Sequence, residues 1–187
     1  MERGFKSRCE NIAKGLRLEL GLSSVDPLPP RFLSAHLDVP IFALTEIDGV
    51  DPRDVHQLVS VDPNAWSAIT VSVGEREAII TNPNNKGGRF STDIMHELAH
   101  LLLGHEPSTM FFMTEKDIAL RGFSKESEDE ANWLAGAILL PREALVFLRS
   151  SRKTEDEICN DYEVSRQLLQ MRINVTGVDS QIKRRHR

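Results

Sequence analysis

Apolar positions near the start of the chain recur every three or four residues. They are Phe5, Cys9, Ile12, Ala13, Leu16 and Leu20. This spacing predicts an amphipathic helix over 5–21. The stretch that follows contains three prolines, which end a helix. A short helix over 31–36 and a first strand over 38–44 are expected next.

Alternation replaces the helical spacing in the middle of the chain. Ile69, Val71 and Val73 alternate with polar residues within 66–73, and this period of two predicts a strand. A second β run over 77–81 follows a glycine, so the two runs predict a hairpin. The acidic stretch between the first strand and this hairpin contains glycine and prolines, which favours a loop with one helical turn.

Helical patterns dominate the rest of the chain. We expect helices over 92–103, 127–140 and 142–149, and two short helices within 154–173. Gly104 is placed to end the first of these, and the region after it is expected to be a loop. A helix, then strands, then helices is the order of an α+β fold.

Composition narrows the class of protein. The 187 residues are 40% hydrophobic and 27% charged, which is ordinary for a globular protein in water. No apolar run approaches the roughly 18 residues of a membrane-spanning helix. The net charge of −5 argues against a surface built broadly for nucleic acid. Two cysteines far apart form no disulfide framework, so we expect a cytoplasmic protein with no membrane contact.

The helix predicted over 92–103 carries groups that are costly to bury. It is apolar almost all round, yet it contains His96, Glu97 and His100. The four-residue spacing puts the two imidazoles on one face, so that both can reach one zinc ion. Glu97 is then placed to take a proton from water and pass it to the leaving amine, as in zinc proteases. Zinc is the expected ion, and manganese is the alternative at such a site.

A third protein ligand must come from elsewhere, because catalytic zinc sites use three and keep one position open. The helix predicted over 127–140 begins with carboxylates. Glu128 shares a face with Asn132, which could hydrogen-bond a histidine ligand. Spacing alone leaves three other carboxylates open, since acidic residues also suit a first helical turn. They are Glu126, Asp129 and Glu130.

His105 is out of step with the extended zinc motif that has a third histidine six residues after the second. We therefore expect His105 to be a helix-end residue satisfied locally, where its charge suits the helix dipole. The donor that would stabilise an oxyanion stays open among four residues. They are Arg89, His105, Arg121 and Tyr162.

Two motifs taken together resemble a known family. The run HELAHLLL begins at His96, EDEANWLA begins at Glu128, and LLP closes the second helix. This pair resembles the ImmA/IrrE family of metallo-endopeptidases, from about residue 5 to residue 150. Leu134 and Leu140 stand where the family usually has Phe and Met, and both are changes in apolar packing.

The resemblance implies a zincin-like fold with a small antiparallel sheet, an active-site helix and a second helix that bears a ligand. It also implies that His96, His100 and Glu128 bind the metal, that Glu97 is the general base, and that Asn132 supports a ligand. Residues 1–150 would be this metallopeptidase domain.

Members of the family act on protein partners. Several cleave a helix-turn-helix repressor encoded beside them and release phage, mobile-element or stress genes, and others are grouped with toxin–antitoxin pairs. The resemblance thus implies a repressor or antitoxin as substrate. The alternative is a non-hydrolytic, metal-stabilised regulatory or toxin protein that binds its partner or DNA. The run from Met110 to Met113 is expected to pack under a loop, with a substrate pocket or lid as the alternative.

The end of the chain is expected to be a helical appendage over 151–176 and a basic, flexible tail over 177–187. The pattern within 154–173 resembles a helix-turn-helix, with Glu163 in place of the glycine usual at the turn. Three residues could contact DNA there: Arg166, Gln167 and Arg172. Several carboxylates in the same segment would face phosphates poorly, so packing or partner docking is the preferred interpretation.

Overall fold

The strands of the described residues form one five-stranded sheet in the order β1-β3-β2-β5-β4. The computed structural model describes residues 1–74, 76–106, 109–113, 118–151 and 153–185. The strands are β1 (Ile41–Ala43), β2 (Ala68–Val73), β3 (Arg76–Thr81), β4 (Thr109–Met113) and β5 (Ile118–Gly122). The mixture of helices with this small sheet confirms the α+β class.

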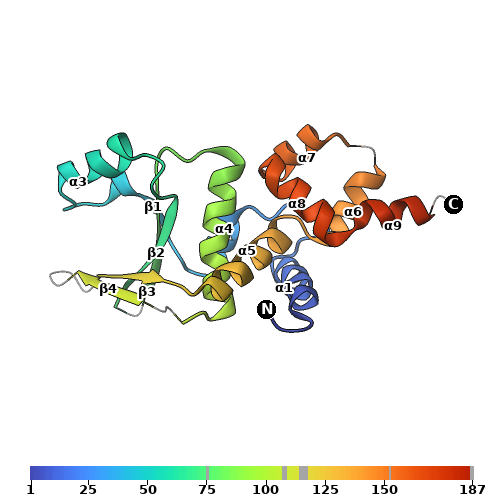
Figure 1. Ribbon diagram of the computed structural model, residues 1–187, viewed down its shortest axis with the longest axis horizontal. Coiled ribbons are helices and arrows are strands. Elements are labelled where there is room, and N and C mark those ends of the chain that lie inside the picture. Colours follow the sequence, from blue (N-terminus) through green and yellow to red (C-terminus); the bar gives the residue numbers. More distant parts are fainter. Residues whose placement is uncertain (75, 107–108, 114–117, 152, 186–187) are drawn as a thin grey trace.

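In the order of the sequence, two α-helices of the described part precede the first strand, two lie between strands, and the others follow the last strand. They are α1 (Phe5–Glu19), α2 (Pro30–His36), α3 (Pro52–His56), α4 (Gly87–Leu103), α5 (Lys125–Leu139), α6 (Arg142–Ser150), α7 (Glu155–Asp161), α8 (Arg166–Thr176) and α9 (Val178–Arg185). Two short helical segments are η1 (Leu44–Glu46) and η2 (Gln57–Val61). Figure 1 shows α4 between the sheet and the C-terminal helices. No single helix among the described residues is long and apolar enough to cross a membrane.

The sheet is mixed, so the expectation of a purely antiparallel sheet was wrong. β2 and β3 form the predicted hairpin, with Ile69 opposite Ile80. β1 pairs in parallel with β3, with Ile41 opposite Ile79. A parallel pair needs a long connection. The segment between β1 and β2, which carries α3 and η2, supplies this length.

A second hairpin lies where the sequence predicted only a loop. β4 and β5 pair antiparallel, and β5 also pairs with the free edge of β2, where Val71 lies opposite Leu120. These strands lack the alternation that marked β2. Their pairing with an existing sheet edge is a tertiary effect that no local pattern reports.

The core forms where α4 and α1 pack against α5. Ile94, Met95 and Leu98 of α4 are fully buried, as are Leu134 and Ile138 of α5. Several positions of α5 are alanine or glycine, and these small side chains let the neighbouring helices approach closely. Burial of this face fixes α5 against α4, and the candidate site lies along the same contact.

Two buried arginines hold the end of α5. The last carbonyls of a helix have no partner within it. Arg17 donates to the carbonyl of Ile138 at 2.7 Å, and Arg172 donates to that of Leu140 at 2.9 Å. Each of these two arginines is 1% exposed. Arg172, one of the three residues named for possible DNA contact, is therefore buried against α5 in this structure.

The C-terminal helices pack on the rest of the protein. The turn between α7 and α8 lies directly against the first turn of α4, because a Cβ added to Gly88 would come within 2.2 Å of the Val164 backbone. Glu163 in that turn adopts a left-handed backbone conformation, with φ of 50°. This is the conformation for which glycine is usual.

The flexible tail expected over 177–187 is a helix over most of its length. α9 begins after Gly177, whose φ is 64°. Arg149 of α6 donates two hydrogen bonds to the carboxylate of Asp179, at 3.0 and 3.1 Å. Arg142 also donates to Gln181. These contacts order the segment against α6, which the basic composition did not indicate.

Candidate metal centre

Helix α4 carries the residues of the HExxH motif. It begins five residues before the predicted start and ends at Leu103, where Gly104 takes the expected left-handed conformation with φ of 64°. His96 and His100 lie one turn apart on this helix, as their spacing predicted. His100 is 1% exposed and His96 is 18% exposed.

Glu128 of α5 completes a group of three possible ligands. Its Oε2 lies 3.1 Å from Nε2 of His96, and its Oε1 lies 3.6 Å from Nε2 of His100. The two histidine Nε2 atoms are 3.1 Å apart. Bonds of about 2.0–2.1 Å in a tetrahedral zinc site place neighbouring ligand atoms about 3.3–3.5 Å apart. These separations are close to that spacing, so the two imidazoles and the carboxylate could hold one metal ion.

The other acidic candidates of α5 are engaged elsewhere or do not join the group. Glu126 accepts from the N-terminal ammonium group at 2.5 Å, and Glu130 lies against His105. Among the described residues, the group of side chains that could hold a metal ion consists of His96, His100 and Glu128.

Asn132 lies where the sequence placed it, beside a histidine. Its Oδ1 is 3.0 Å from Nδ1 of His96. An amide oxygen accepts, so Nδ1 of His96 carries the proton and Nε2 is left with a free lone pair. This tautomer directs Nε2 toward the other two possible ligands.

Glu97 has a partner that sequence reasoning missed. The hydroxyl of Thr70 on β2 donates to Oε2 of Glu97 at 2.6 Å. Burial raises the pKa of the Glu97 carboxyl, while the Thr70 hydrogen bond and the nearby His96 oppose that rise. A raised pKa suits a group that must accept and then release a proton near neutral pH. The polar face of β2 is the only sequence signal that pointed to Thr70.

His100 is held on more than one side. Its imidazole stacks on Phe123, with ring centroids 3.8 Å apart and planes inclined by 19°. Nδ1 of His100 lies 3.0 Å from Nδ1 of His105. Burial lowers the pKa of His100 to about 3, and His96 and His105 act in the same direction. The imidazole is thus neutral at ordinary pH, which is the form that binds a metal.

Other sequence candidates lie away from this centre or outside the described part. The Tyr162 hydroxyl donates to the carbonyl of Val25 and the residue is 6% exposed, so it does not serve as an oxyanion donor. Burial raises the pKa of Tyr162 to about 12. The run from Met110 to Met113 forms β4, but its side chains lie outside the described residues, and so does that of Arg121.

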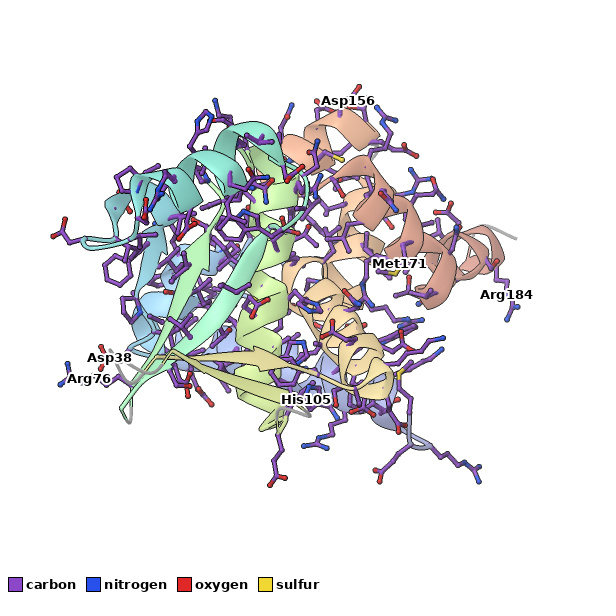
Figure 2. All side chains as sticks on the ribbon, turned by 60° about the vertical axis from the view of Figure 1, so that its left-hand side comes forward. Asp38, Arg76, His105, Asp156, Met171 and Arg184 are labelled. Atoms are coloured by element: carbon purple, nitrogen blue, oxygen red, sulfur yellow. The ribbon has the colours of Figure 1, made fainter. Side chains whose placement is uncertain are left out.

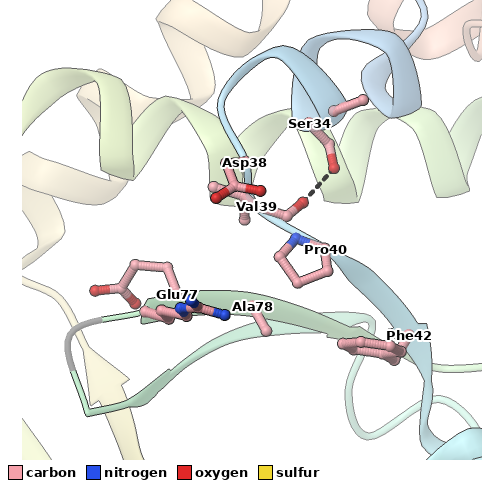
Figure 3. Close-up of a pocket in the computed structure, with 9 residues that line it drawn as sticks. Ser34, Asp38, Val39, Pro40, Phe42, Glu77 and Ala78 are labelled. Carbon is pink, nitrogen blue, oxygen red and sulfur yellow. Dashed lines mark hydrogen bonds between the residues drawn. The ribbon is translucent and has the colours of Figure 1, made fainter.

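Two cavities lie at the surface, one at β3 and one at α8. One of about 590 Å³ lies between the α2–β1 connection and β3, where Asp38, Pro40 and Phe42 line it (Figure 3). None of the three possible ligands lines it. Another of about 500 Å³ lies between α4 and α8 and is lined by Thr92. None of the three possible ligands lines this second cavity either.

Comparison with protein families agrees with this geometry. Residues 53–174, more than half of the chain, match the family described as Peptidase_M78, IrrE N-terminal-like domain. The matched range contains all three possible ligands, and it agrees with the resemblance of the paired motifs. Comparison with curated protein sequences found no match.

Proposed function

Because the chain belongs to the IrrE N-terminal-like domain family of metallopeptidases, we propose that it is a zinc-dependent endopeptidase that cleaves a partner transcriptional repressor. The observation that carries this proposal is the meeting of His96, His100 and Glu128, whose ligand atoms lie within 4.8 Å of one another. Glu97 stands at the next position of the same helix. The ion is zinc in this proposal, with manganese as the alternative at a histidine–carboxylate site.

Each side chain of the centre has one proposed task. His96, His100 and Glu128 hold the ion. When bound there, zinc supplies Lewis-acid polarisation of the scissile carbonyl and activation of water. The Glu97 carboxylate, held by the Thr70 hydroxyl, accepts a proton from the attacking water and delivers it to the leaving amine nitrogen. Asn132 keeps His96 in the tautomer that presents Nε2.

The proposed substrate is a helix-turn-helix repressor or antitoxin, in a phage, mobile-element, stress or toxin–antitoxin setting. Its support is the resemblance of the paired motifs, since members of that family act on such partners. A cytoplasmic location belongs to the same proposal.

The alternative is a regulatory or toxin protein that binds its partner or DNA without hydrolysis. DNA binding through α8 has little support from the geometry. Arg172 is buried, and Arg166 is paired with Glu155 and Asp156. The two hypotheses differ in what they predict for Glu97. Replacing Glu97 stops the activity if the protein cleaves its partner, and has no such effect if it only binds the partner.

The test replaces Glu97 with Gln and compares the variant with Glu143→Gln, the same change at an exposed carboxylate. Each is co-expressed with the helix-turn-helix repressors encoded in the same genome, and cleavage is followed by mass spectrometry. We expect Glu97→Gln to bind one zinc ion and to cleave at least about 100-fold more slowly, because general base catalysis is lost. Glu143→Gln should cleave normally. Undiminished cleavage by Glu97→Gln would overturn the proposed mechanism, and binding without any cleavage by the wild type would favour the alternative.

A further inference from the structure

The backbone turn at the end of α4 places His105 against His100, one of the possible metal ligands. Gly104 adopts a left-handed conformation, its N–H donates to the carbonyl of Leu101, and the N–H of His105 donates to that of His100, both at 3.1 Å. This pair of bonds is the Schellman motif, in which the side chains five residues apart are in contact. An apolar pair usually fills these two positions. Here both are imidazoles.

The contact continues into a chain of polar groups. Nδ1 of His105 lies 3.0 Å from Nδ1 of His100, and Nε2 of His105 lies 3.4 Å from Oε2 of Glu130 on α5. The side chain of His105 is 10% exposed and that of Glu130 is 18% exposed. Figure 2 shows His105 at the end of α4, near the first turns of α5.

The chemistry of these groups gives the chain one direction. A carboxylate only accepts hydrogen bonds, so Nε2 of His105 carries a proton and donates to Glu130. Nδ1 of His105 then has no proton, and it accepts a hydrogen bond from the protonated Nδ1 of His100. The only nitrogen of His100 left with a free lone pair is Nε2, which faces Glu128 and His96.

We propose that His105 and Glu130 form a positioning pair that fixes the tautomer and the ring orientation of His100, so that Nε2 of His100 is presented to the metal. The inference rests on the proposed function, because it takes His100 as a ligand. His105 is the helix-end residue with a local partner that the sequence predicts, and its second contact, with Glu130 of α5, adds the positioning task. Asn132 fixes the tautomer of His96 in the same way, by accepting a hydrogen bond from its Nδ1. Helix α5 therefore provides Asn132 and Glu130, which support the two histidines, and also Glu128.

The first test reads the tautomer directly in the metal-free protein. Nitrogen-15 NMR distinguishes a protonated Nδ1 from a protonated Nε2 in a neutral imidazole. In the wild type we expect His100 to carry its proton on Nδ1. In His105→Ala the acceptor is gone, so His100 should populate the other tautomer. His105→Gln should restore the wild-type form, because a side-chain amide oxygen already accepts from Nδ1 of His96 in this protein. His56→Ala, at an exposed histidine, is the matched control.

The second test measures zinc affinity by competition with a chelator. Partners of metal ligands typically change metal affinity by about 10–100-fold, and we expect a loss of this size in His105→Ala. Glu130→Ala should weaken binding in the wild-type background and have no further effect in His105→Ala, because Glu130 acts through His105. Equal losses in both backgrounds would show that the two residues act independently and would overturn the pairing.

The outcomes separate this inference from the proposed function. An unchanged His100 tautomer and unchanged zinc affinity in His105→Ala would overturn the positioning pair, while cleavage by the wild type could still stand. If His105→Ala fails to fold, His105→Gln and Glu130→Ala decide the question by the same two measurements. Failure of the wild type to bind zinc would count against the proposed function, and the tautomer in the metal-free protein would still test the contact.

Discussion

At the scale of single residues, the centre depends on polar side chains that each have one defined partner. Thr70 hydrogen-bonds Glu97, Asn132 hydrogen-bonds His96, and His105 hydrogen-bonds His100. A buried polar group without a partner is costly, so these contacts stabilise the protein as well as orienting the site. The HExxH motif identifies the three residues that would act. Two of their partners lie on β2 and α5, and the third follows the end of α4.

The Thr70 contact yields a prediction about rate and pH. Thr70→Val keeps the shape of the side chain and removes the hydroxyl. A hydrogen bond to a charged group is worth about 1.5–3 kcal/mol, so kcat/KM on the acidic limb should fall by about 10–100-fold. The hydroxyl stabilises the ionised carboxylate, and its loss raises the pKa of Glu97 further. The acidic limb of the pH–rate profile should therefore move to higher pH.

Thr70→Ser is the matched control, since it keeps the hydroxyl and should keep the wild-type profile. The measurement is kcat/KM against pH with the substrate identified by the cleavage experiment. An acidic limb that does not move in Thr70→Val would show that the hydrogen bond does not act on the catalytic carboxylate.

At the scale of elements, α4 is fixed from both ends. Its first turn meets the turn between α7 and α8 at Gly88, and its last turn meets α5 through His105 and Glu130. The C-terminal helices are thus part of the support of the metal helix. This arrangement explains why a segment that resembles a helix-turn-helix packs inward.

Gly88 gives a prediction about stability. Its added Cβ would lie 2.2 Å from the carbonyl carbon of Val164 and 2.3 Å from the nitrogen of Ser165, both of which are backbone atoms. Gly88→Ala must push the two segments apart, so we expect a loss of about 1–3 kcal/mol in the free energy of unfolding. Urea denaturation followed by circular dichroism measures it.

Gly15→Ala in α1 is the control for the Gly88 change. A Cβ there meets nothing within 4 Å. Alanine is the better helix former, so this variant should gain about 0.5–1 kcal/mol. Equal effects of the two substitutions would contradict the close contact at Gly88.

At the scale of the whole molecule, the candidate metal centre joins segments that are distant in the chain. His96 and His100 come from α4 and Glu128 comes from α5, while Glu97 is tied to β2 through Thr70. An ion held by these ligands would bind the folded state and not the unfolded chain. Its binding free energy would then stabilise the packing of α4 on α5.

Metal removal should therefore lower the melting temperature. At a free zinc concentration of about 100 times the Kd, the gain in stability is about 2.7 kcal/mol. For a chain of this size that corresponds to a rise in Tm of about 5–10 °C over protein treated with chelator. Calorimetry with and without zinc measures the shift. His100→Ala should show none, and His56→Ala should show the full shift.

The sequence by itself determined what lies on one helix. The four-residue spacing of His96 and His100, the adjacent Glu97 and the end of α4 at Gly104 are consequences of helical periodicity and local backbone preference, which act within a few residues. The hairpin of β2 and β3 was predictable for the same reason, since its alternation and its turn are contiguous.

The tertiary structure alone decided which distant groups meet. Spacing left Glu128 open among four carboxylates of α5, and only the packing of α5 on α4 brings its oxygens to both histidines. Tertiary packing also decided four other features. They are the parallel pairing of β1, the β4–β5 hairpin, the burial of Arg172 and the hydrogen bond from Thr70 to Glu97. Each depends on how segments far apart in the chain exclude water together, and no local pattern carries that information.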